Sequence, residues 1–163
     1  MMANSEFLKS LVGRDLNING SSSNKKNKNN KKKGPDAVSG ELYDVKEDYL
    51  VVLSDDGAQY IRLNHIKTIS ENFFHNNDNK NQDNDSEYDF EIYEADTFNE
   101  LLRKSRYKYC TVSSGGPNKV QGIIESVDDD FVNIVSENEY VQIPLYHVRM
   151  IDFSVQQNNN DKK

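Results

Sequence analysis

The sequence predicts an all-β protein made of two small barrels in tandem, each preceded by a short helix. Three observations carry this prediction, and the first two are an internal repeat and an alternation of apolar and polar residues with period two inside each copy. Composition is the third, because only 35% of the 163 residues are hydrophobic, whereas soluble domains usually have about 45–50%. This deficit favours two small cores over one large core.

The repeat aligns residues 34–70 with residues 116–152 at an offset of 82, without a gap. Eleven of these 37 positions are identical, and nine further pairs keep their chemistry, among them Leu42/Ile124 and Tyr49/Phe131. Upstream the match resumes at an offset of 94, so the first copy carries an insertion, residues 21–33. The two copies are therefore expected to share one fold.

A short helix is predicted at the start of each copy, because apolar residues recur there at spacings of three and four. These residues are Phe7, Leu8, Leu11 and Val12 in the first copy and Phe98, Leu101 and Leu102 in the second. Each helix spans about two turns and is too short to be stable without packing against the rest of its unit.

Short strands are predicted after each helix. Tyr49, Val51 and Leu53 alternate with period two, and the residues are β-branched or aromatic, as is typical of strands. Gly40 and Gly122 lie inside strands, where glycine is unfavourable unless the backbone bends or approaches a neighbour closely. Five such strands in about 55 residues favour a small, strongly bent barrel of the SH3-like or Sm-like kind.

The units are separated by polar segments. We predict a first barrel unit at 1–72, an acidic Asn/Asp-rich linker at 73–94, a second barrel unit at 95–154 and a disordered tail at 155–163. In the last part of the linker, Phe90 and Ile92 alternate with polar residues and predict an additional edge strand.

The insertion at 21–33 is basic, with six lysines in a chain whose net charge is -7. Such a loop could bind nucleic acid or another anionic surface. It contains no arginine and no aromatic residue that could stack on bases. This composition favours a solvated loop, or one that pairs with acidic segments such as the linker of another copy.

Catalytic, metal and cofactor sites are not expected. His65 and His147 occupy equivalent positions before the last strand of each copy, without a nucleophile or orienting carboxylate nearby, so we expect them to bond backbone carbonyls. Cys110 is opposite Leu16 of the first copy, which predicts a small apolar role, and an intermolecular crosslink is the alternative. Neither a secretory signal nor a membrane span is recognisable, and we expect synthesis in a cytoplasm.

Two family resemblances follow from these residues. The second copy resembles Sm-like proteins, with a strand glycine at Gly122, an acidic turn at residues 129–133 and a closing strand that contains Arg149. This resemblance implies an RNA-binding module in which Asp130, Asn133 and Arg149 contact a base and phosphate. We keep RNA binding as the alternative function.

The second resemblance extends over nearly the whole chain. Each unit has a Gly-Pro pair, a glycine five residues after the proline, an Asp-Tyr or Asp-Phe pair and a closing His-Ile/Val-Lys/Arg-x-Ile motif, here His65–Ile69 and His147–Ile151. Such tandem units resemble the spore coat protein B family of endospore-forming bacteria. The resemblance implies a non-enzymatic structural protein that is made in the mother-cell cytoplasm and deposited in the outer layers of the spore coat.

A structural role of this kind needs surfaces that bind other coat proteins or further copies of the chain, rather than a membrane or nucleic acid. Strand edges expose unpaired N–H and C=O groups that can pair with another chain. We therefore expect the final strands of the two units to carry the assembly contacts. The candidate residues are Ile66, Lys67, Ile69, Val148, Arg149 and Ile151.

Overall fold

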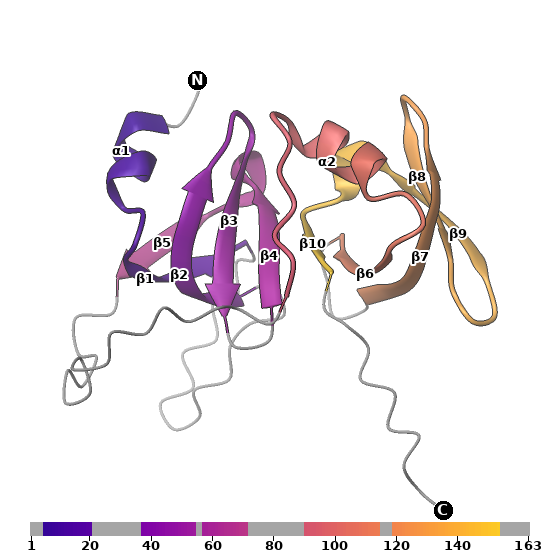
Figure 1. Cartoon of the computed structure of the whole chain (residues 1–163), viewed down its shortest axis with the longest axis horizontal. Coiled ribbons are helices and arrows are strands. Elements are labelled where there is room, and N and C mark those ends of the chain that lie inside the picture. The colour runs from indigo at the N-terminus through magenta and orange to yellow at the C-terminus, as the bar shows by residue number, and fades with distance from the viewer. Residues whose placement is uncertain (1–4, 21–36, 55–56, 72–89, 115–118, 154–163) are drawn as a thin grey trace, which may run out of the picture.

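The computed structural model describes residues 5–20, 37–54, 57–71, 90–114 and 119–153. In these residues, ten antiparallel strands form one sheet that is accompanied by two short α-helices (Figure 1). The all-β prediction is confirmed. The predicted loop at 21–33, the predicted tail at 155–163 and most of the predicted linker at 73–94 lie outside the described residues.

The first unit forms one half of this sheet. It consists of α1 (Ser5–Ser10), β1 (Asp15–Asn19), β2 (Ala37–Val45), β3 (Tyr49–Ser54), β4 (Gly57–Arg62), the 3-10 helix η1 (Leu63–His65) and β5 (Thr68–Glu71). Its strands lie in the order β5-β1-β2-β3-β4. Leu16, Ile18, Leu42 and Leu50 are fully buried in its core.

The second unit forms the other half. It consists of α2 (Phe98–Lys104), β6 (Tyr109–Ser113), β7 (Lys119–Val127), β8 (Phe131–Val135), β9 (Tyr140–Pro144), the 3-10 helix η3 (Leu145–His147) and β10 (Met150–Asp152). Its strand order, β10-β6-β7-β8-β9, repeats that of the first unit. Even the irregularities repeat, since the register shift after Leu42 in the first unit recurs after Ile124 in the second.

The two separate barrels are not confirmed. The sheet is open, with β5 and β9 as its terminal strands, and β4 of the first unit pairs with β10 of the second. Backbone groups of β4 that a closed barrel would use within its own unit bond the neighbouring unit instead. The strands of the two units are therefore continuous in one sheet.

Strand β3 is buried on both faces. Leu50 and Val52 face the core of the first unit, whereas Tyr49, Val51 and Leu53 belong to the core of the second unit. A strand that is covered on both sides has a continuous apolar run, as the residues of β3 do. The first unit thus supplies part of the second unit's core.

The helices differ in how well they match the prediction. In α2, Phe98, Leu101 and Leu102 are fully buried, as expected. The predicted face of the first helix is wrong in part, because Phe7 is 62% exposed and Val12 is 44% exposed. Since α1 ends at Ser10, Val12 lies beyond the helix and does not continue its buried face.

The segment before α2 is not the edge strand that its alternation predicts. Phe90 and Ile92 lie outside any strand, although both pack against the core of the second unit. As Figure 1 shows, this segment runs alongside β4. It covers the outer face of β3 and β4 with side chains instead of adding a strand.

Candidate assembly interface

The two units meet where β4 pairs antiparallel with β10, a contact that we call the joint. The register pairs Gln59 with Asp152, Tyr60 with Ile151 and Ile61 with Met150. The Arg62 N–H extends the ladder by donating a hydrogen bond to the Arg149 carbonyl, with an N–O distance of 3.0 Å. Because β10 also pairs with β6, the final strand of the second unit is bonded on both sides.

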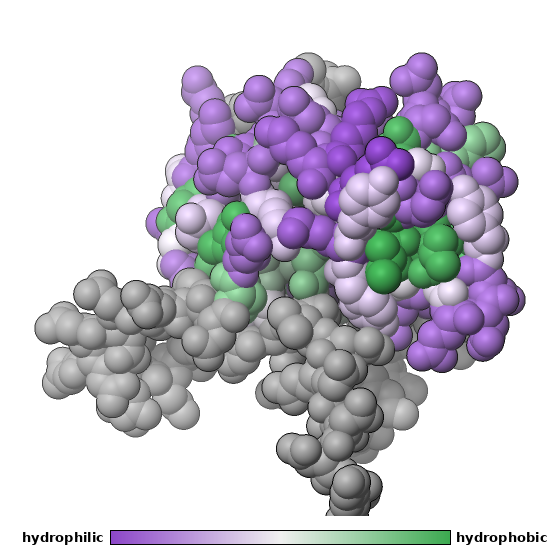
Figure 2. All heavy atoms as spheres, turned by 45° about the vertical axis from the view of Figure 1, so that its right-hand side comes forward, coloured by the Kyte–Doolittle hydropathy of each residue, from purple (hydrophilic) through white to green (hydrophobic). Residues whose placement is uncertain are grey.

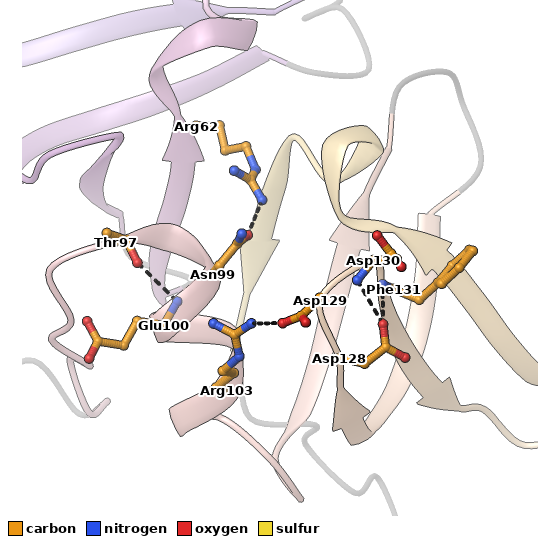
Figure 3. A network of polar contacts seen from close by, with 9 residues as sticks. All are labelled: Arg62, Thr97, Asn99, Glu100, Arg103, Asp128, Asp129, Asp130 and Phe131. Carbon is orange, nitrogen blue, oxygen red and sulfur yellow. Dashed lines mark hydrogen bonds and ion pairs between the residues drawn. The ribbon is translucent and has the colours of Figure 1, made fainter.

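Arg62 holds the joint with its side chain. Its guanidinium donates to the carbonyls of Val148 at 2.9 Å and Leu145 at 3.2 Å, and to the Asn99 side chain at 2.6 Å (Figure 3). The guanidinium carbon lies 4.4 Å from the centre of the Phe98 ring. Burial lowers the pKa of Arg62. One side chain of the first unit therefore contacts both α2 and η3.

Two buried tyrosines of the first unit bind the segment that precedes α2. The Tyr49 hydroxyl donates to the Ala95 carbonyl and accepts a hydrogen bond from the Ala95 N–H at 3.2 Å. The Tyr60 hydroxyl accepts from the Tyr93 N–H at 2.8 Å. Burial raises the pKa of both hydroxyls, so both stay protonated at neutral pH. These bonds satisfy backbone groups of a segment that has no strand partner.

Asp48 of the first unit also holds the start of α2. Its carboxylate accepts a hydrogen bond from the Phe98 N–H at 2.8 Å. Thr97 is the N-cap residue, and its hydroxyl accepts from the Glu100 N–H at 3.2 Å. The first turn of α2 therefore depends on a side chain from the other unit for one of its backbone donors.

The two histidines lie in different surroundings despite their equivalent positions. His65 bonds the Tyr146 carbonyl across the joint, with an Nε2–O distance of 3.2 Å, as expected of a residue that bonds a backbone carbonyl. Burial lowers its pKa, and the nearby charge of Arg149 adds to the effect. His147 is exposed, with its ring centre 4.2 Å from that of Tyr146.

Cys110 is fully buried in β6, and burial raises the pKa of its thiol to about 12. Such a thiol is unreactive near neutral pH, as expected for a residue with an apolar role. Within the described ranges, no group of His, Cys, Asp and Glu residues has the arrangement of a metal site. Nor does any helix in this part of the chain have the length and apolarity needed to span a membrane.

Comparison with known proteins identifies one curated relative. Spore coat protein B of Bacillus subtilis (strain 168) is 29% identical to this chain over 119 residues, which are 72% of the chain. The chain is therefore similar to a spore coat protein over most of its own length. The matched region makes up 30% of the length of that relative. No protein-family profile and no solved structure matches the chain.

The predicted assembly residues lie in different settings in the two units. In the second unit, Val148 and Ile151 are fully buried, and the Arg149 carbonyl accepts the backbone bond of the joint. The final strand of this unit, β10, is paired on both sides within the chain. In the first unit, the equivalent residues precede or form β5, where Lys67 is exposed and Ile69 is half-buried. Ile66 packs against the core of its unit.

The residues of the alternative RNA-binding turn lie in three different settings. Asp130 is exposed, in a turn that Asp128 holds by accepting bonds from the N–H groups of Asp130 and Phe131 (Figure 3). Asn133 is 5% exposed, and its amide bonds the side chains of Ser126 and Gln142. Arg149 lies at the joint, where it lines a small cavity with His65.

Sequence reasoning missed the joint and the residues that build it. Tyr60 and Arg62 were not named as site residues, yet Arg62 bonds Val148, Leu145 and Asn99, and Tyr60 bonds the Tyr93 N–H. A signal for them exists in the repeat, because the equivalent positions are Gln142 and Pro144, which have different chemistry. Positions where one copy departs from the other mark the contacts that only one copy makes.

Proposed function

We propose that the protein is a non-enzymatic structural component of the bacterial endospore coat. The name of its relative, spore coat protein B, supports this role. In this proposal the chain is made in the mother-cell cytoplasm and deposited in the outer coat layers. Its partners are other coat proteins and further copies of itself, and it needs no cofactor.

We further propose that it assembles through strand edges into a multivalent protein layer. The observation that carries this proposal is the joint, in which edges from two repeated units pair by backbone hydrogen bonds. The same chemistry can operate between chains, because β5 and β9 end the sheet. Several weak edges on one particle strengthen one another through effective concentration.

The experiment that tests the coat role is peptide mass spectrometry on purified, washed spores of the source organism. Coat extract is compared with mother-cell and vegetative-cell lysates. We expect strong enrichment of peptides from this chain in the coat extract. Detection in the soluble lysate alone would contradict the proposal.

RNA binding is the alternative, and the surroundings of Asn133 give it less support because the amide already bonds two protein side chains. Binding of labelled oligouridine to the purified protein at two salt concentrations distinguishes the two functions. Contacts to phosphate would make the affinity fall with salt. The coat proposal predicts no shift at micromolar protein.

A further inference from the structure

The second unit presents to solvent the surface that the first unit buries in the joint. The equivalent pairs, with their exposed fractions, are Tyr49 (0%) and Phe131 (38%), Leu53 (3%) and Val135 (45%), and Ala58 (5%) and Tyr140 (57%). Figure 2 brings this end of the molecule forward and shows a cluster of hydrophobic atoms on it. Exposed apolar clusters on a soluble protein mark binding surfaces.

The strand edges show the same difference, because edges that are paired in the joint have equivalents that end the sheet. In the joint, the fourth strand of one unit pairs with the last strand of the other, β4 with β10. The two strands that end the sheet are β9, the fourth strand of the second unit, and β5, the last strand of the first unit. The described sheet therefore ends in the same two kinds of edge that pair inside it, one at each end (Figure 1).

We propose that β9 of one copy pairs antiparallel with β5 of a second copy, in the register of the joint. The inference rests on the proposed coat function and names its partner, a further copy of this chain. The offset of 82 fixes the expected pairs as Val141 with Ser70, Gln142 with Ile69 and Ile143 with Thr68. Contacts of this head-to-tail type give rings if the rotation closes and filaments if it does not.

The contact between copies is expected to be weaker than the joint, because two joint residues, Arg62 and Tyr60, are replaced. Pro144 stands where Arg62 donates its backbone and guanidinium bonds, and proline has no N–H to offer. Gln142 stands where Tyr60 bonds the Tyr93 N–H. Association should therefore be reversible and concentration-dependent.

Disulfide trapping tests the register directly. The Arg62 N–H faces β10, and the backbone groups of a strand alternate in direction, so the pair three positions along, Gln59 with Asp152, is a non-hydrogen-bonded pair. Its equivalent between copies is Val141 with Ser70. Opposed residues of this kind have a Cα separation of about 4.5 Å, which is within the range of disulfides.

Two full-length variants are made on a C110A background, one with Val141→Cys and one with Ser70→Cys, and are mixed under mild oxidation. We expect a covalent dimer in the mixture at several times the amount in either variant alone. Gln121→Cys, an exposed position in the internal strand β7, replaces Val141→Cys in the matched control mixture and should give only background. A dimer yield in the mixture that is no higher than in this control overturns the proposal. An equal dimer yield from Ser70→Cys alone overturns it as well.

A second measurement needs no new cysteine. Sedimentation of the unmodified chain over increasing concentration should show association. Tyr140→Asp should raise the dissociation constant of this association at least several-fold. Tyr43→Asp, at a 41% exposed position of the first unit, should leave the dissociation constant unchanged. A chain that stays monomeric throughout overturns self-pairing but not the coat role, which the spore fractionation decides separately.

Discussion

At the scale of single residues, the two strand glycines have the clearest physical requirement. A Cβ built on Gly40 would lie 2.2 Å from the Leu53 carbonyl oxygen, and one on Gly122 would lie 2.3 Å from that of Val135. Backbone atoms cannot move away as a flexible side chain can. The close approach of the neighbouring strand therefore explains why glycine stands at both positions.

Gly122→Ala should consequently destabilise the fold by about 1–3 kcal/mol, the usual cost of overpacking. Urea unfolding followed by circular dichroism measures this change in the free energy of unfolding. Gln121→Ala, at the exposed neighbouring position, should change it by less than about 0.5 kcal/mol. Equal effects of the two substitutions would contradict the steric argument.

His65 makes stability depend on pH. Its pKa in the folded protein is lowered by burial, and the charges of Arg149, Arg62 and His147 add to the effect. The unfolded state therefore takes up the proton first, near the ordinary value of about 6.5. The free energy of unfolding should fall as the pH is lowered from about 7 through that value.

His65→Gln should remove this component, so the free energy of unfolding should change less between neutral and mildly acidic pH than in the unmodified chain. Chemical denaturation at a series of pH values measures the slope. His147→Gln is the matched control, because His147 occupies the equivalent position of the second unit and is exposed. The argument fails if both variants keep the slope of the unmodified chain.

At the scale of elements, the joint depends on a guanidinium. Arg62→Lys keeps the positive charge but loses the planar group that bonds two carbonyls and Asn99 and stacks on Phe98. The free energy of unfolding should fall by about 1.5–3 kcal/mol, the scale of a hydrogen bond to a charged group. Thermal and urea unfolding measure the loss.

The control is Arg106→Lys, since Arg106 also bonds a carbonyl, that of Glu125, and lies 4.6 Å from the Tyr107 ring, but is exposed. It should cost little, because exposed contacts are weak. A loss for Arg62→Lys no larger than this would mean that the joint does not rely on the side chain.

Much of the element level follows from the sequence, and the pairing between units does not. The alternation in β3 and the spacing in α2 predict a strand and a helix because each repeats the geometry of its backbone. Period two reveals that a strand has two faces, but it does not say which chain segment covers each face. The joint and the open sheet depend on that missing information, and so does the packing of Phe90 and Ile92 without a strand.

The candidate assembly residues show the same limit. The closing motif located both final strands, but nothing in it distinguishes β10, which is paired on both sides, from β5, which ends the sheet. The difference arises because one chain contains two units, so that one of the two final strands finds its partner internally. Sequence equivalence between repeats therefore does not imply equivalent exposure.

At the scale of the whole molecule, the two units share a core. Tyr49, Val51 and Leu53 of the first unit belong to the cluster that contains Phe98 and Ile134 of the second, and Met150 of the second belongs to the core of the first. Loss of one unit would expose apolar surface of the other. Unfolding should therefore be a single cooperative transition.

Coincident urea transitions by far-ultraviolet circular dichroism and tyrosine fluorescence would confirm this cooperativity. Tyr60→Ala removes a fully buried ring at the joint and should cost about 3–5 kcal/mol, as for other buried aromatic residues. It should also separate the transitions of the two units. Two separate transitions in the unmodified chain would contradict the shared core.

The joint also has a consequence for the order of events during biosynthesis. Because both of its strands belong to one chain, β4 and β10 meet at an effective concentration that does not fall when the protein is diluted, whereas the concentration of another molecule does. The apolar outer face of β3 is therefore covered by its own chain before a foreign strand can reach it. The same chain thus completes its fold as a separate step, and its remaining edges become relevant only once the protein has accumulated.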